Sequence, residues 1–217
     1  MVEFLTQNAS ALFGLGGALG AVCLTFLTRW LLRKRDYDLR LWDRLLERRI
    51  DAHERLINVA IEMRVMVGLG GLDEEREVVR APQVLISKEV FEDWCTRAVG
   101  SGVAPSTWLS IAAKREANFL QDYLVTLKLN LEHIPSDKYL AVGAIIRQDF
   151  VEISAQLERT AYSFFERDIR KLRLDDLSEW HKYPRERTEE RLKKTQLISR
   201  FAELAQLADR ENERNHN

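Results

Sequence analysis

Arg48 and His53 are the two residues of this sequence whose types and spacing best suit catalysis. A histidine titrates near neutral pH and can act as a general acid or base, and an arginine can stabilise the charge that develops when a phosphodiester is cleaved. A looser pair, Arg210 and His216, lies in the polar C-terminal tail. Arg48 and His53 are therefore the candidate catalytic residues.

The spacing of Arg48 and His53 resembles that of ribonucleases of the HEPN class, all-α proteins in which two subunits oppose an Arg and a His to cleave RNA. The resemblance covers six residues. It implies an RNA-cleaving enzyme in which His53 is the general acid or base and Arg48 stabilises the phosphorane-like charge. The alternative interpretation, which we favour, places both residues on a solvated face of a helix.

Other patterns that carry chemistry are not found in the sequence. There are two cysteines, and Cys23 lies in an apolar run, so a disulfide framework and a cysteine-based zinc site are excluded. The four histidines include no His-Glu-x-x-His motif, and no glycine-rich phosphate loop is found. The 33 basic residues balance 34 acidic ones, which does not favour nucleic acid as a partner. We expect no metal and no cofactor, and favour a protein that is not an enzyme.

An uncharged run of 25 residues lies between Glu3 and Arg29. About 20 apolar residues in a helix cross a hydrocarbon core of roughly 30 Å. The run therefore predicts a transmembrane helix over residues 11–32, after a short extracytoplasmic tail, residues 1–10. The alternative is a cleaved leader, which is disfavoured because no basic residue precedes the run, and because a bulky Val22 stands before Cys23 where a lipoprotein leader has a small residue.

A cluster of cations follows the apolar run and sets its expected orientation. Loops rich in Lys and Arg stay in the cytoplasm, and Trp and Tyr favour the membrane–water interface. We expect a single-pass protein of the inner, or plasma, membrane, with its N-terminus outside, its C-terminal domain in the cytoplasm and the lipid bilayer as a partner. The predicted membrane-interface residues are Arg29, Trp30, Arg33, Lys34, Arg35 and Tyr37.

Gly16 and Gly20 form a small-xxx-small motif within the predicted span. Such motifs allow membrane helices to approach closely and to associate. Ser10, Gly14 and Ala18 form a second line of small residues on nearly the opposite face. We predict self-association through Gly16 and Gly20, and hence a homo-oligomer, although glycine is also common in membrane helices that do not associate.

No Gly or Pro occurs from Ala21 to Val67, so the helix is expected to continue beyond the membrane as an amphipathic stalk over residues 33–67. Its heptad-like spacing is interrupted where Arg49 or His53 falls, which argues against a long coiled coil and for packing against the chain's own bundle or a neighbouring subunit. Residues 68–86, around Pro82, are expected to form an extended connector or a short ribbon.

The remainder predicts a cytoplasmic helical bundle over residues 87–210, with a polar tail, residues 211–217. Ser87 is the expected N-cap of a short helix. Two long helices, the first beginning at Pro105, are expected to form an antiparallel hairpin around Pro135 and Ser136, followed by a last helix after Pro184. Their apolar faces are Ala113, Ala117, Leu120, Leu124, Leu127, Leu131, Ile134; Tyr139, Val142, Ile146, Phe150, Ile153, Leu157, Ala161, Phe164; and Leu197, Phe201, Leu204, Ala208. The expected fold class is all-α.

These features favour a single-pass membrane-anchored helical protein that self-associates and acts as a scaffold, adaptor or effector at the cytoplasmic face of the membrane, with a cytoplasmic protein partner. The layout resembles that of small bacterial accessory and effector proteins of phage-defence systems, some of which oligomerise to breach the inner membrane. The resemblance is one of layout, and it implies an oligomeric membrane-perturbing protein. The alternative is a membrane-tethered ribonuclease that uses Arg48 and His53.

Overall fold

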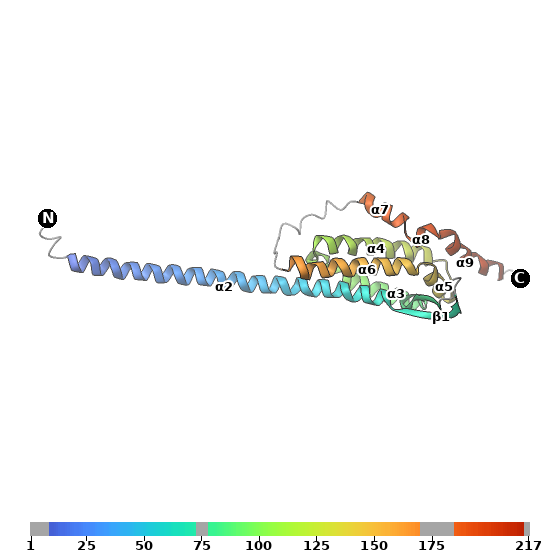
Figure 1. Cartoon of the computed structure of the whole chain (residues 1–217), viewed down its shortest axis with the longest axis horizontal. Coiled ribbons are helices and arrows are strands. Elements are labelled where there is room, and N and C mark those ends of the chain that lie inside the picture. Colours follow the sequence, from blue (N-terminus) through green and yellow to red (C-terminus); the bar gives the residue numbers. More distant parts are fainter. Residues whose placement is uncertain (1–8, 73–77, 170–184, 215–217) are drawn as a thin grey trace. The chain divides into compact units, whose positions relative to one another are not determined.

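The computed structural model describes residues 9–72, 78–169 and 185–214 (Figure 1). The chain divides into two compact units, residues 1–47 and residues 48–217. Parts of the expected tails, residues 1–8 and 215–217, lie outside the described residues.

The first unit is formed by helix α2, Ala9–Arg64, which also supplies the first residues of the second unit. The expected uninterrupted helix is confirmed, although it ends at Arg64 instead of Val67. The hydroxyls of Thr25 and Thr28 each donate a hydrogen bond of 2.7 Å to the carbonyl four residues earlier. These polar side chains are therefore satisfied within the helix.

Side chains along α2 are described from Leu19 onward, so the first part of the predicted span, residues 11–18, lies outside that description. Among the described residues, no helix is both long and apolar enough to cross a membrane. The side-chain surroundings of Gly16 also lie outside the described part of the chain.

A β-hairpin follows α2 in the second unit, so the described residues are mostly helical and the all-α prediction is confirmed only in part. Strand β1, Met66–Leu72, pairs antiparallel with β2, Val78–Pro82, with Met66 opposite Pro82. The register shifts between Gly68 and Leu72, and Gly70 has a φ of 70°, which glycine adopts without strain. Of the two forms predicted for residues 68–86, the short ribbon is confirmed, and the short 3₁₀ helix η1, Gln83–Leu85, follows it.

Helix α3, Lys88–Arg97, begins where the sequence predicts. The Ser87 hydroxyl accepts a hydrogen bond from the Val90 N–H at 3.3 Å, which confirms the predicted N-cap. A π-helical segment, η2, Ala98–Val103, and a 3₁₀ segment, η3, Ala104–Trp108, lead to the next helix.

The predicted antiparallel hairpin is formed by α4, Ile111–Leu131, and α6, Arg147–Ser163, which lie side by side (Figure 1). Helix α4 begins after its N-cap Ser110, later than the predicted start at Pro105. The second arm is divided at Ile146 into α5, Tyr139–Ile145, and α6, and the 3₁₀ turn η4, Ser136–Lys138, precedes it. Every residue of the two predicted apolar faces is buried.

Three helices follow where one was predicted: α7, Arg185–Lys193, α8, Gln196–Ser199, and α9, Phe201–Arg214. Leu197 and Leu204 are buried as expected. Phe201 is 53% exposed, so its predicted place in the core is wrong. The breaks fall at Thr195 and at Arg200, whose backbone leaves the helical region. The side chain of Ala208 lies outside the described residues.

The core of the second unit is built from α2, α3, α4, α5, α6 and the C-terminal helices. Its large buried aromatic side chains include Phe91, Trp94, Phe119, Tyr123, Tyr139, Phe150 and Phe164. Gly143 lets α5 lie close to the hairpin, since a Cβ there would be 3.1 Å from the Cβ of Ala81. Arg64 at the end of α2 forms an ion pair with Glu158 of α6.

Candidate functional site

His53 lies in the core of the second unit with 0% of its surface exposed. Its Nδ1 is 2.7 Å from the Arg49 carbonyl oxygen, which can only accept, so Nδ1 carries the proton. Its Nε2 then accepts the backbone N–H of Ser110 at 3.1 Å. The ring is thus a neutral tautomer that joins α2 to the N-terminus of α4.

The faces of the His53 ring are also covered. Phe164, in the π-helical segment η5, Phe164–Asp168, stacks on it with ring centroids 3.9 Å apart and planes 11° apart. Phe165 meets it edge-on at 6.2 Å, and the Arg49 guanidinium lies 4.9 Å from the centroid of Phe164. His53 is therefore a packing residue at the junction of three elements, and its predicted place on a solvated helix face is wrong.

Arg48 has different neighbours from His53. Its side chain is exposed, and its guanidinium lies 5.2 Å from the ring centroid of Trp108. Five residues along a helix turn the side-chain direction by about 140° beyond a full turn. The structure does not place the two side chains in one open site within the chain. The catalytic interpretation of Arg48 and His53 stays a prediction.

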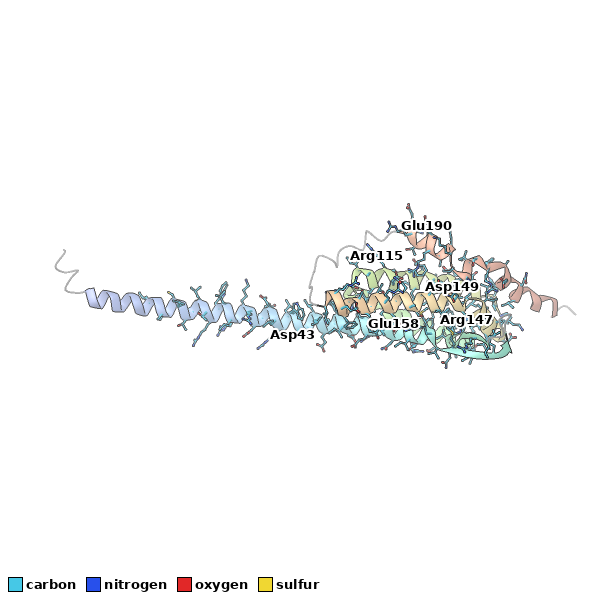
Figure 2. The ribbon with its side chains drawn as sticks, in the orientation of Figure 1. Asp43, Arg115, Arg147, Asp149, Glu158 and Glu190 are labelled. Atoms are coloured by element: carbon cyan, nitrogen blue, oxygen red, sulfur yellow. The ribbon has the colours of Figure 1, made fainter. Side chains whose placement is uncertain are left out.

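Asp149 is a buried acidic residue that the sequence reasoning missed (Figure 2). It is 4% exposed, and its carboxylate accepts the Tyr123 hydroxyl at 3.0 Å. It also accepts the backbone N–H groups of Gln196 at 2.7 Å and Leu197 at 2.9 Å. Asp149 thereby caps the N-terminus of α8 from a position on α6. The signal in the sequence that could have revealed Asp149 is its position next to Phe150, which belongs to the predicted apolar face of this helix.

Burial raises the pKa of Asp149, and the hydrogen bonds from Gln196, Leu197 and Tyr123 act against that increase. Burial, together with the neighbouring Asp149 carboxylate, also raises the pKa of Tyr123 well above 10. The Tyr123 hydroxyl is thus kept protonated and remains the donor to Asp149.

Two arginines add to the contacts between the C-terminal helices and the hairpin. Arg191 of α7 bonds to the Glu116 carboxylate at 2.6 Å, and its guanidinium lies 3.8 Å from the ring centroid of Phe119. Arg200 donates to the Ile145 carbonyl at 3.3 Å. With Asp149, these contacts bind α7, α8 and the start of α9 to α4, α5 and α6.

A groove of about 390 Å³ lies between α3 and α4. Its floor includes the buried Phe91 and Tyr139, and its rim includes Val125 and Leu129, which are 54% and 63% exposed. The charged residues that line it are Lys88, Glu92, Lys128 and Glu132. This α3–α4 groove is a concave surface of the second unit that could receive a ligand or a partner segment.

The first unit carries a long exposed apolar surface. Eight large apolar side chains are each between 52% and 71% exposed: Leu19, Val22, Leu24, Phe26, Leu27, Trp30, Leu31 and Leu32. With about 100° between successive residues, they cover all sides of the helix. Lys34 lies 5.9 Å from the ring centroid of Trp30, so two of the predicted membrane-interface residues are adjacent.

Comparisons with protein-family models, curated proteins and solved structures find no match to this chain. Among the described residues, no group of three His, Cys, Asp or Glu side chains is placed to hold a metal ion. The function must therefore be inferred from the chain's own surfaces. The most unusual of these in the described residues is the first unit, where α2 exposes large apolar side chains that a solvated helix would not carry.

Proposed function

We propose that this chain is a single-pass membrane-anchored protein that self-associates and acts as a scaffold, adaptor or effector at the cytoplasmic face of the membrane. The observation that carries the proposal is the exposure of eight large apolar side chains on α2 between Leu19 and Leu32. A helix that is apolar on all sides is stable only when lipid or protein surrounds it.

The energetics favour lipid as that surrounding. Burying one large apolar side chain contributes about 1.5–3 kcal/mol, so eight of them strongly favour transfer out of water. The uncharged run from residue 4 to residue 28 adds no charged group to oppose that transfer. Thr25 and Thr28 bond to helix carbonyls, which removes the penalty of an unsatisfied hydroxyl in hydrocarbon.

The second unit supplies the part that would act on a partner. It is a folded helical core with a β-hairpin, and its α3–α4 groove offers an apolar floor with charges of both signs at the rim. A groove of this composition fits an amphipathic segment of a cytoplasmic protein. An anchor joined to such a unit is the layout of an adaptor.

Membrane anchoring is tested with the full-length protein by alkaline extraction of the membrane fraction. We expect the protein to stay in the membrane pellet. A Leu24→Arg, Leu27→Arg variant should appear in the soluble extract, since each arginine at the centre of a span costs about 2.5–3.5 kcal/mol. Leu41→Arg is the matched control and should remain in the pellet. Extraction of the unaltered protein would contradict the anchor.

Self-association is tested at Gly20. A Cβ at Gly20 would meet no atom of its own chain within 4 Å, so Gly20→Ile leaves the single helix unstrained. We expect this variant to show much less cross-linked oligomer in detergent, because the added side chain keeps two helices apart. Ala21→Ile, on a different side of the helix, should cross-link as the wild type does. Equal cross-linking of all three proteins would contradict association through the Gly20 face.

A further inference from the structure

Four cations lie within seven residues of α2: Arg29, Arg33, Lys34 and Arg35. At about 100° per residue, the side chains of Arg33, Lys34 and Arg35 point about 40°, 140° and 240° around the helix axis from the direction of Arg29. The same seven residues rise by about 9 Å along the axis. These four residues therefore form a narrow basic collar that surrounds most of the circumference of the helix.

The net positive charge of the first unit is confined to the collar. The next twelve residues of the unit, 36–47, carry four acidic side chains and two arginines, Arg40 and Arg44. Among the described residues, no ion pair joins a collar cation to a carboxylate. The collar thus keeps its charge available for a ligand outside the chain.

Apolar side chains are interleaved with the cations. Leu31 and Leu32 lie within the collar and are more than half exposed, and Trp30 lies beside Lys34. Long Lys and Arg side chains can extend towards polar headgroups while apolar neighbours stay in the acyl region. Tyr37, one turn further on, is also exposed and suits the same interface.

We propose that the collar binds the headgroups of anionic phospholipids, and so selects a negatively charged leaflet for this protein. A leaflet surrounds a crossing helix on all sides, which matches cations spread around the circumference. A protein partner, or a helix lying flat in the interface, would gather the cations on one face. The inference rests on the proposed membrane anchor.

Trp30 provides a direct probe of the lipids around the collar. The full-length protein is reconstituted in vesicles of phosphatidylcholine mixed with phosphatidylglycerol, with either the one lipid or the other brominated to quench tryptophan. A Trp30→Phe variant measures the share of the quenching due to Trp30. We expect brominated phosphatidylglycerol to quench Trp30 several-fold more strongly at equal mole fraction, and the preference to weaken in high salt.

Matched double variants locate the preference. Arg33→Gln with Arg35→Gln should reduce the preference for phosphatidylglycerol severalfold, since each cation near an anionic leaflet is worth a factor of about five. Arg40→Gln with Arg44→Gln removes the same charge beyond the collar and should retain the preference. Quenching by both lipids without preference would overturn the collar proposal while leaving the anchor intact. Quenching by neither lipid would overturn the anchor, and the collar proposal with it.

Discussion

Replacing Asp149 with alanine is expected to lower the free energy of unfolding of the second unit by about 3 kcal/mol, and to loosen α8 first. The carboxylate accepts two backbone N–H groups and the Tyr123 hydroxyl; the bonds from Tyr123 and Leu197 are buried, and the bond from Gln196 is part-buried. Alanine leaves these three donors without an acceptor, and each buried donor left unpaired costs about 1–3 kcal/mol before relaxation.

Two measurements check the expected effect of Asp149→Ala. Urea unfolding gives the loss of stability, and hydrogen exchange of the Gln196 and Leu197 amides reports the release of α8. Asp149→Asn should fall between alanine and the wild type because it keeps one acceptor oxygen. Glu152→Ala, an exposed position on the same helix, is the control and should change stability by less than about 0.5 kcal/mol. Amides that exchange at the wild-type rate in Asp149→Ala would contradict the capping role.

The pKa of Asp149 also sets the sign of a pH effect. Because burial raises the folded-state pKa above its usual 3.8, the folded protein holds this proton more tightly than the unfolded chain. The stabilisation from protonated Asp149 is therefore present below about pH 3.8 and is lost as pH rises through the raised pKa. Asp149→Asn should remove this segment of the pH dependence of unfolding, which leaves a flatter curve over the same range.

The helix faces could be predicted because they depend on local spacing alone. The apolar steps of α4 and of α5 with α6 are all buried, as a period of 3.6 residues requires. The break at Ile146 and those at Thr195 and Arg200 have no such local cause. The last two adjoin the Asp149 and Ile145 contacts, which join residues about 50 positions apart. At Thr195 and Arg200, tertiary contacts therefore end helices that the 3.6-residue spacing of apolar residues would continue.

Residues 68–86 were predicted as an extended connector or a short ribbon, but which of the two forms, and what surrounds the buried polar residues, could not be predicted from the sequence for related reasons. Met66–Leu72 contains three glycines, which weaken the strand pattern of its sequence. Pairing with β2 is what holds this segment as a strand. His53 was visible as a residue able to do chemistry, but its environment is set by Ser110 and Phe164, both distant in sequence. Residue type alone identified the group, and packing decides its role.

Replacing His53 with alanine is expected to lower the free energy of unfolding by about 3 kcal/mol. The substitution removes the stack on Phe164 and the hydrogen bonds to Arg49 and Ser110, and leaves a cavity between α2 and α4. Urea unfolding measures the loss. His53→Phe fills the space without the hydrogen bonds and should recover part of it. A His53→Ala protein as stable as the wild type would contradict the packing role.

Arg48 separates that packing role from the ribonuclease alternative. Its side chain is exposed and contacts Trp108 by a cation–π interaction worth about 0.5–1 kcal/mol, so Arg48→Ala should fold normally. If the protein is a ribonuclease, Arg48→Ala should lose cleavage of a labelled RNA as fully as His53→Ala does, although the stability of Arg48→Ala is unchanged. If His53 is only a packing residue, we expect Arg48→Ala to leave RNA cleavage unchanged. Any change in cleavage by His53→Ala should then be proportional to the fraction of that variant that is unfolded. Cleavage lost in Arg48→Ala at full stability would instead establish the enzyme, because unfolding could not explain it.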